Sequence, residues 1–208
     1  MAAAEPHTTA MPPLFSRRVK VIATLLALGL TAWLSVAWYG RSQVQVVAAE
    51  ELLTCQGTEV VVEEAIGSDE VMMPYAVVRE HMRCSVHFQV RNQGPLPVRV
   101  RWVALRNYGP DGGMWAQATR LEPFQPAPPP VGHPFQNDAV FVPAEPYRLG
   151  AGEVGEFAVD LVYRPPGCRG GEGLRAVTNS PWVRVNVWGT SGDRVLAGDS
   201  FGLACVGR

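Results

Sequence analysis

The four cysteines of the chain are the residues whose chemistry the sequence constrains most: Cys55, Cys84, Cys168 and Cys205. All four follow the apolar segment 21–39, which we expect to direct the rest of the chain out of the cytoplasm. The compartment outside is oxidising, and this favours disulfide bonds. Four thiolates could also bind zinc, but structural zinc sites usually bring their ligands in closely spaced pairs, and the chain contains no Cys-x-x-Cys. The cysteines therefore predict two disulfides.

A short segment resembles the nucleophile motif of a serine protease. Gly198-Asp199-Ser200-Phe201-Gly202 is similar to the Gly-Asp-Ser-Gly-Gly motif of chymotrypsin-like proteases, and His81 and His87 come earlier in the chain. That family has glycine where this chain has Phe201, and it needs a long segment after its serine. We therefore do not expect this activity.

A sortase-like transpeptidase is the stronger enzyme hypothesis, because sortases share an N-terminal anchor, an exported β-fold and a modest length. They use His, Cys and Arg in that order. Leu52-Leu53-Thr54-Cys55 resembles the lead into their nucleophile, but Cys55 precedes every histidine of the exported part. Cys205 and Arg208 have the required order without the threonine. A free thiol at Cys205 would favour this alternative, and a disulfide there would exclude this version of it.

A copper carrier is a further alternative. Met72, Met73, His81, Met82 and His87 offer thioether and imidazole groups, which suit copper, and some periplasmic copper carriers are β-sandwiches. However, adjacent residues of an extended chain point to opposite faces, and methionine is more often a filler of the core. We therefore expect no bound cofactor or metal.

Two segments are candidate interaction surfaces. Arg91, Arg99 and Arg101 cluster around one turn and could meet lipid head groups, an acidic wall polymer or a protein, although such a row also serves as a solvated face that prevents edge pairing. The segment 122–134 carries six prolines, among them Pro128, Pro129 and Pro130. It is long for a loop in a compact domain, which is typical of a functional loop.

The stretch from Val21 to Tyr39 contains nineteen residues without a charge. At about 1.5 Å rise per residue, a helix of this length nearly spans a hydrocarbon core of roughly 30 Å. Arg17, Arg18 and Lys20 precede it, so the positive-inside rule places the N-terminus in the cytoplasm. A cleavable signal peptide, cut after small residues at 35–37 or 47–49, is the alternative, but the apolar run exceeds the usual length of a signal core.

These features divide the chain into a disordered cytoplasmic tail (1–20), a transmembrane helix (21–39) and one exported domain (40–208). The formal net charge is −1. From residue 42 onward, 14 arginines stand against 18 carboxylates, so this region lacks the positive field that nucleic-acid binding uses. We expect a single-pass protein of the cell membrane that does not bind nucleic acid.

The exported part reads as antiparallel strands joined by Gly-, Pro- and Asn-containing turns. In 84–90, the apolar residues alternate with polar ones, and in 98–106 we expect Val98, Val100 and Trp102 on the face opposite Arg99 and Arg101. The proline-rich segment 122–134 is expected outside the sheet, because proline removes ladder donors. Further strands are expected at 44–47, 59–62, 114–119, 139–142, 156–163, 182–188 and 195–204, with a hairpin turn at 189–193.

The stretches CSVHFQVRNQGPLPVRVRWVAL (84–105) and YRLGAGEVGEFAVDLVY (147–163) resemble bacterial immunoglobulin-like domains held outside the membrane by an N-terminal anchor. The resemblance implies an all-β fold, an immunoglobulin-like antiparallel β-sandwich, although the Cys…Trp…Cys spacing of true immunoglobulin domains is absent. In such a strand order Cys55 lies beside Cys84, and Cys168 and Cys205 emerge at one end. We therefore expect these two pairs.

Fold alone does not fix function. The leading hypothesis from the sequence is a non-enzymatic single-pass membrane protein whose extracytoplasmic β-sandwich binds another envelope protein or a wall component.

Overall fold

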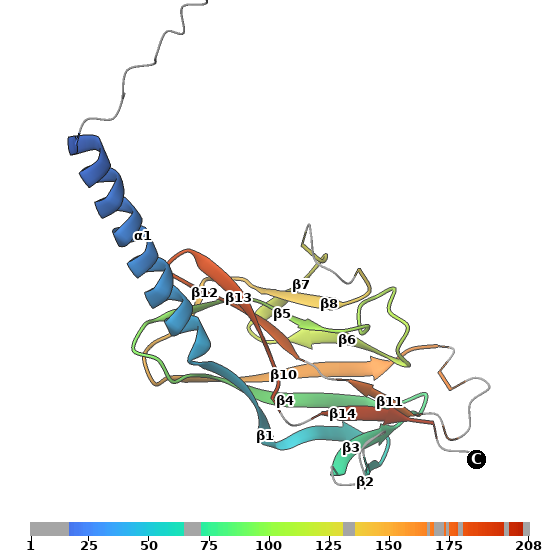
Figure 1. Cartoon of the computed structure of the whole chain (residues 1–208). Coiled ribbons are helices and arrows are strands. Elements are labelled where there is room, and N and C mark those ends of the chain that lie inside the picture. Colours follow the sequence, from blue (N-terminus) through green and yellow to red (C-terminus); the bar gives the residue numbers. More distant parts are fainter. Residues whose placement is uncertain are drawn as a thin grey trace, which may run out of the picture. The chain divides into compact units, whose positions relative to one another are not determined.

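The computed structural model describes residues 17–64, 72–130, 136–165, 167–168, 173, 175–178, 181–197 and 200–205. The chain forms two compact units, residues 1–36 and residues 37–208. The first described element is the helix α1 (Arg17–Ser42), and the described residues that follow it form β-strands joined by turns (Figure 1).

The helix confirms that the apolar segment is helical. The part from Val19 to Ser42 is long and apolar enough to cross a membrane, a test that a signal sequence also meets. Residues 1–16 of the expected disordered tail (1–20) lie outside the described residues. Residues 17–20 are described, and they are helical. The charges at 17, 18 and 20 do not end a helix, because lysine and arginine are good helix formers.

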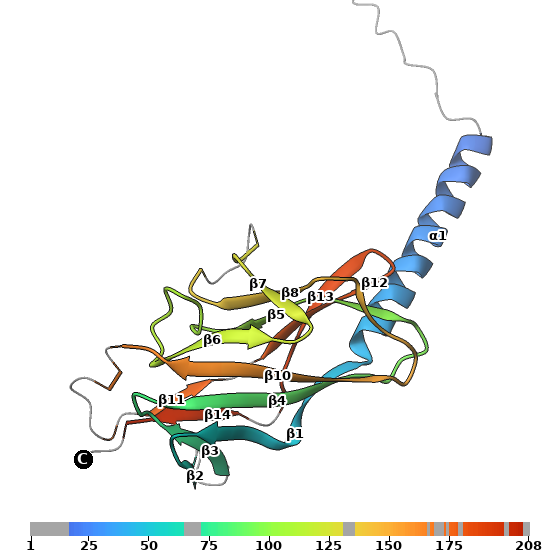
Figure 2. The same cartoon turned by 180° about the vertical axis from the view of Figure 1, so that it is seen from behind.

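Ten strands form one antiparallel sheet in the order β1-β4-β10-β6-β7-β8-β5-β12-β13, with β9 paired to β5 beside this path. Their bounds are β1 (Val44–Gln56), β4 (Arg83–Asn92), β5 (Val98–Leu105), β6 (Ala116–Leu121), β7 (Phe124–Ala127), β8 (Ala139–Pro143), β9 (Tyr147–Leu149), β10 (Val154–Tyr163), β12 (Trp182–Val187) and β13 (Thr190–Val195). The two ends of this sheet meet where Val46 bridges to Leu196 and the Ala197 amide donates to the Val46 carbonyl (3.1 Å). This contact is a single isolated bridge and not a ladder, so the large sheet is a curled half-barrel and not a closed barrel (Figures 1 and 2).

A second sheet has four strands in the order β11-β14-β3-β2. The bounds are β2 (Val60–Glu64), β3 (Met72–Val77), β11 (Arg175–Thr178) and β14 (Phe201–Ala204), and β14 runs parallel to β3. One face adds Ala76, Phe201 and Leu203 to the main core, and the other carries a small cluster that includes Met73 and Tyr75.

Alternation along the strands builds the core inside the curled sheet. Val86 and Phe88 of β4 are fully buried, as the pattern predicts, and Phe88 stacks on Phe157 of β10 at 5.3 Å between ring centroids. Phe157 also contacts Phe124 and Tyr147, at 5.6 Å and 5.3 Å. Burial of these side chains is the main favourable contribution to folding. The all-β class is confirmed.

Trp102 lies on the opposite face from the one expected. In the pairing of β5 with β12, Trp102 faces Arg184 and Val100 faces Val185, so Arg101 is an extra residue in a β-bulge. A bulge reverses the alternation that follows it. Trp102 and Ala104 therefore point outward into a cluster with Val140, while Val103 and Leu105 enter the core.

The proline-rich segment begins inside the sheet, which corrects the expectation that all of 122–134 lies outside it. Strand β7 pairs with β8 from Phe124 to Ala127, and Pro126 lies opposite Phe141. On its other side β7 pairs with β6 only at Leu121 and Phe124. Beyond Phe124 this side is therefore an edge, where proline is tolerated.

The strand expected at 195–204 is also wrong. The hairpin turns earlier than expected, at Trp188 and Gly189, whose φ angles are 48° and 84°. Two consecutive residues with positive φ match the twist of a tight hairpin. Strand β13 consequently occupies 190–195, and β14 at 201–204 joins the second sheet.

Candidate functional site

An irregularity in β1 shapes the outward face of the sheet. Ala48 faces Phe88 of β4 and Leu53 faces Val86, so the four residues 49–52 stand opposite the single residue His87. Strand β1 therefore bulges away from β4 at His87. The bulge carries Glu50 and Glu51, which both point to solvent.

A groove of about 870 Å³ lies on this face, over β1, β4, β10 and the end of β6. His87 and Ala158 lie opposite each other on its floor, in the register of β4 with β10. The small side chain of Ala158 leaves the space beside His87 open. The groove therefore results from two sequence features, the four-residue bulge and an alanine at the centre of β10.

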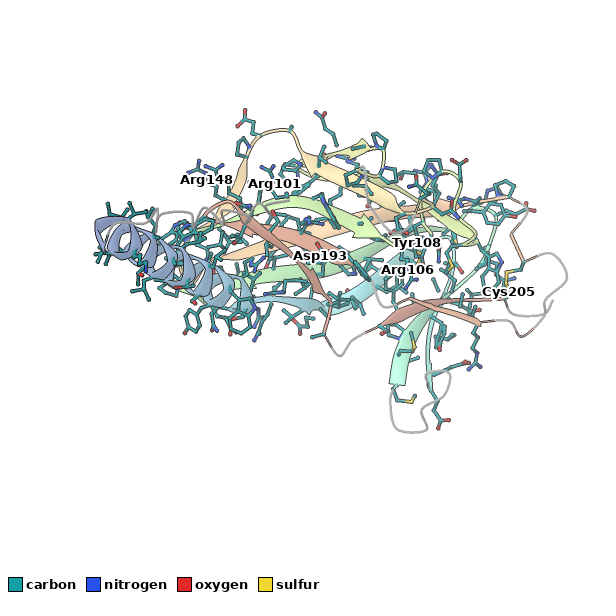
Figure 3. The ribbon with its side chains drawn as sticks, turned by 45° about the horizontal axis from the view of Figure 1, so that its top comes forward. Arg101, Arg106, Tyr108, Arg148, Asp193 and Cys205 are labelled. Carbon is teal, nitrogen blue, oxygen red and sulfur yellow. A yellow bond between two sulfur atoms is a disulfide. The ribbon has the colours of Figure 1, made fainter. Side chains whose placement is uncertain are left out.

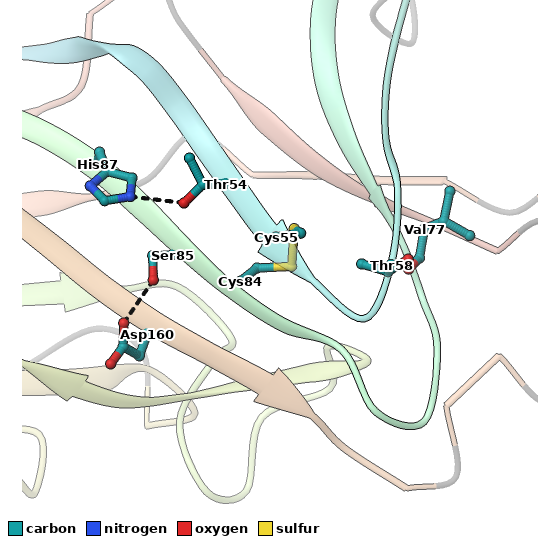
Figure 4. The surroundings of a disulfide bond; sticks show 8 residues. All are labelled: Thr54, Cys55, Thr58, Val77, Cys84, Ser85, His87 and Asp160. Carbon is teal, nitrogen blue, oxygen red and sulfur yellow. Dashed lines mark hydrogen bonds between the residues drawn. A yellow bond between two sulfur atoms is a disulfide. The ribbon is translucent and has the colours of Figure 1, made fainter.

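Cross-strand hydrogen bonds order the polar side chains of the floor. Thr54 Oγ1 and His87 Nε2 lie 3.0 Å apart, and Ser85 Oγ donates to Asp160 Oδ1 at 2.8 Å (Figure 4). Gln89 Nε2 donates to Glu156 Oε1 at 3.2 Å. The second ring nitrogen of His87 has no hydrogen-bond partner among the residues that the structure describes.

The groove is acidic. Five carboxylates line it, against one guanidinium, that of Arg120. Arg120 forms an ion pair with Glu122, and this hydrogen bond and charge raise the pKa of Arg120 above its usual value. The remaining carboxylates have no cation of the described chain within ion-pair distance. The five carboxylates are Glu50, Glu51, Glu122, Glu156 and Asp160.

Both expected disulfides are present. Cys55 and Cys84 are register partners of β1 and β4, with 4.1 Å between their Cα atoms (Figure 4). Cys168 is bonded to Cys205, with 5.6 Å between their Cα atoms. None of the four thiols is free. The sortase-like hypothesis therefore loses the thiolate that it assigned to Cys205.

The structure does not bring the candidate copper ligands together. Met73 is buried in the outer cluster of the second sheet, and Met82 is buried in the main core. Met72 is exposed, His81 lies in a turn, and His87 bonds to Thr54 in the groove. Within the described part of the chain, no group of three or more His, Cys, Asp or Glu side chains could hold a metal ion.

The three arginines that cluster in the sequence lie on two different strands that do not pair. Arg91 is on β4, where its guanidinium donates twice to Gln89 Oε1, at 2.8 Å and 3.1 Å. Arg99 and Arg101 point outward from β5 and line a separate hollow. Only Arg91 is therefore next to the groove.

Pro128, Pro129 and Pro130 follow β7, and none of them lines the groove. The rest of the proline-rich segment, residues 131–134, lies outside the described residues.

Sequence reasoning missed the carboxylates of the groove. The visible signal was a break in alternation, because the pattern of Val44 and Val46 gives way to Ala48-Ala49-Glu50-Glu51. Bulges are over-represented at sheet edges, and β1 is an end strand of the large sheet.

No family model and no curated protein matches the chain. Two solved structures that resemble it are of a family GH20 exo-β-N-acetylglucosaminidase from Vibrio harveyi: an inactive mutant (9% identity, TM-score 0.35) and the enzyme in complex with N-acetylglucosamine (10% identity, TM-score 0.32). Another is the alkylpurine DNA glycosylase AlkC of Pseudomonas fluorescens (16% identity, TM-score 0.32). The matches cover 78–79% of this chain but only 19–31% of those chains. At such TM-scores the likeness supports no conclusion on function.

Proposed function

We propose that this chain is a non-enzymatic, single-pass membrane protein whose extracytoplasmic domain binds a cationic segment of another envelope protein in the groove over His87. The observation that carries the proposal is the acidic groove itself, an ordered hollow of about 870 Å³ on the outward face of the sheet. Its size is within the range of ligand sites.

The proposed location rests on two features of the chain. The helix Val19–Ser42 is long enough to anchor it, and Arg17, Arg18 and Lys20 favour a cytoplasmic N-terminus. Two disulfides in the domain that follows fit an oxidising compartment outside the cytoplasm.

The proposed ligand follows from the charge of the groove. Carboxylates accept hydrogen bonds from lysine and arginine, and a hollow lined by one sign of charge attracts the other. Glu50 and Glu51 stand on the bulge, and Glu156 and Asp160 stand on β10, so a basic side chain over Ala158 would have acceptors on two sides.

We also propose that the domain is a variant of the immunoglobulin-like sandwich. The neighbours β1-β4-β10-β6 correspond to the A-B-E-D order of that fold, and β8-β5-β12-β13 correspond to C′-C-F-G. Two features depart from the pattern, because β7 joins the two halves and β6 precedes β8 in the chain. An experimental structure would test this, and a continuous barrel without an A-B-E-D half would contradict it.

Peptide binding tests the groove. We expect a fluorescent decalysine peptide to bind the purified full chain. The double variant Glu50→Lys, Glu51→Lys should bind the peptide roughly tenfold more weakly, because each exposed ion pair contributes only a modest free energy. The double variant Glu59→Lys, Glu64→Lys makes the same change of net charge on and just before β2, at two residues that do not line the groove, and should bind like the wild type. Equal loss in both variants would show that only net charge matters and would refute the proposed site.

Photocrosslinking in membranes tests the partner class. A benzoylphenylalanine at Glu51 should capture a protein through a lysine- or arginine-rich segment, whereas the same group at the exposed Gln125 on β7 should not. Capture from both positions, or from neither, would contradict the proposal.

A further inference from the structure

A row of outward-pointing side chains crosses four neighbouring strands at one end of the domain. Arg148 of β9 faces Arg99 of β5, Arg99 faces Asn186 of β12, and Asn186 faces Ser191 of β13. Asn186 Nδ2 donates to Ser191 Oγ at 3.0 Å, and the Arg41 guanidinium donates to the Ser191 carbonyl. We call these five residues the arginine row. It leads from the last turn of α1 to β9.

The positive charge of the arginine row is not compensated. Arg99 and Arg148 are direct cross-strand partners, an arrangement of like charges that destabilises a sheet. Neither has an ion pair or a hydrogen bond with a described residue, and the nearby Asp193 is paired with Arg184 at 3.5 Å. The folded chain therefore contains an unfavourable pair of like charges, and a bound anion would reduce the repulsion between them.

A hollow of about 320 Å³ adjoins the arginine row. Arg99 and Arg101 form one side of it, and residues 142–146 form the other. Glu145 lies in the same lining, but no described cation forms an ion pair with it. Arg148 of β9 lies opposite Arg99, two residues before Arg101 on β5, and Figure 3 labels Arg101 and Arg148. Guanidinium groups bind phosphate oxygens bidentately, so the hollow suits a phosphate head group.

An exposed tryptophan lies at the same end. Trp188 is two residues beyond Asn186, in the tight turn between β12 and β13, and 49% of its surface is exposed. Trp38 and Tyr39, at the start of this compact unit, are also exposed, at 64% and 52%. Tryptophan and tyrosine are typical of the interface between lipid and water.

This end of the domain is the one that continues along the chain into α1. A Cβ added to Gly40 would lie 3.0 Å from Leu96 and 3.2 Å from Val187, so the last turn of α1 packs directly on the β12–β13 hairpin. Since Ala37 continues directly into the apolar residues of α1, Trp188 and the arginine row lie at the end of the domain where the span leaves it.

We propose that the arginine row, the hollow beside it and Trp188 bind the head groups of anionic phospholipids in the outer leaflet. The inference rests on the membrane anchor of the proposed function. An acidic wall polymer would offer the same anionic groups, but it would not account for an exposed tryptophan at the membrane-proximal end. Lipid is therefore the partner that the surface fits.

Photocrosslinking to lipid tests the inference on the full chain in nanodiscs of phosphatidylcholine, with or without phosphatidylglycerol. Benzoylphenylalanine is placed at Trp188, at Leu28 within the span, and at Arg83, eight residues along β4 from Arg91 and so about 26 Å from this end. We expect lipid adducts at positions 28 and 188, none at 83, and a higher yield at 188 with the anionic lipid.

The decisive measurement is how the adduct yield at position 188 depends on the charge of the arginine row. In anionic nanodiscs, Arg99→Gln with Arg148→Gln should lower the adduct yield at 188 roughly tenfold, because each arginine near a charged leaflet contributes to binding. The control pair Arg79→Gln, Arg83→Gln should leave it unchanged.

Two outcomes would overturn the lipid contact and leave the proposed function standing. One is a lipid adduct at position 28 without one at position 188. The other is an adduct yield at 188 that changes neither with the charge of the lipid nor in the double variant. In intact cells, an adduct of position 188 with a wall polymer in place of lipid would overturn the choice of partner. Loss of the adduct at 28 would refute the anchor, and with it both this inference and the proposed function.

Discussion

The side-chain amide of Asn92 donates a 2.7 Å hydrogen bond to the carbonyl of Gly150, fifty-eight residues later in the chain. The same amide nitrogen donates to the Leu96 carbonyl at 2.8 Å, and Asn92 Oδ1 accepts the Gly94 amide at 3.1 Å. Asn92 is only 1% exposed. One buried side chain thus joins the β4–β5 turn to the β9–β10 turn, at the end of the domain where α1 is attached.

The first prediction concerns this residue. Asn92→Ala leaves several backbone groups without partners in a buried place, and we expect a loss of about 2–4 kcal/mol in the free energy of unfolding. Asn186→Ala, which removes hydrogen bonds at a partly exposed hairpin, should cost less than about 1 kcal/mol. Thermal unfolding of the detergent-solubilised chain measures both. Equal losses would show that Asn92 does not have the linking role described.

The two disulfides lead to a second prediction. They close loops of 29 and 37 residues, so in the chain-entropy model each contributes roughly 3–4 kcal/mol. Two double variants test this: one carries Cys55→Ala with Cys84→Ala, and the other carries Cys168→Ala with Cys205→Ala. In denaturant titrations both should lose a similar part of the free energy of unfolding. Non-reducing peptide mapping is the independent check, and a peptide that joins Cys84 to Cys205 would contradict the pairing.

Much of this fold could be predicted, because strands with one buried face show alternation in the sequence. Strands β4 and β10 follow the pattern of Cys84, Val86 and Phe88 and of Phe157 and Val159, and their positions were predicted closely. The pairing of the cysteines was expected from the strand order of an immunoglobulin-like sandwich, and both disulfides are present. Alternation reports on one strand and its burial, whereas the pairing of strands into sheets depends on distant contacts.

What could not be predicted depends on those distant contacts. The bulge at Arg101 exists because β12 pairs with β5, and it alone decides that Trp102 faces outward. Pro126 is tolerated in β7 because β6 turns away after Leu121. The groove requires the bulge in β1 to lie opposite His87 and Ala158, and these three segments are far apart in the sequence.

Gly202 supports a third prediction. It is the register partner of Tyr75, and a Cβ at this position would lie 2.5 Å from Tyr75 Cε1. The ring is fully buried and has the Arg175 guanidinium over it at 5.5 Å, so it has little room to move. Gly202→Ala should lower the free energy of unfolding by about 1–3 kcal/mol through overpacking. Gly113→Ala, where nothing lies within 4 Å of the added atom, should change it by less than about 0.5 kcal/mol.

The last prediction concerns pH. Tyr147 is partly buried against Phe124 and Phe157, and burial raises the pKa of its phenol above the usual value, with a smaller contribution from the charge of Glu153. The folded state therefore holds this proton more tightly than the unfolded state does, so the stabilisation is fully present below about pH 10 and is lost as the pH rises through the folded-state pKa. Tyr147→Phe removes the titrating group and keeps the ring contacts. Below pH 9 the stability difference between the wild type and the variant should be constant, and between pH 10 and 11 the wild type should lose stability relative to the variant. Denaturant titrations at fixed pH values give this difference directly, and the other tyrosines cancel because both proteins contain them. A difference that stays constant up to pH 11, or a wild type that gains stability relative to the variant, would contradict the burial of the phenol.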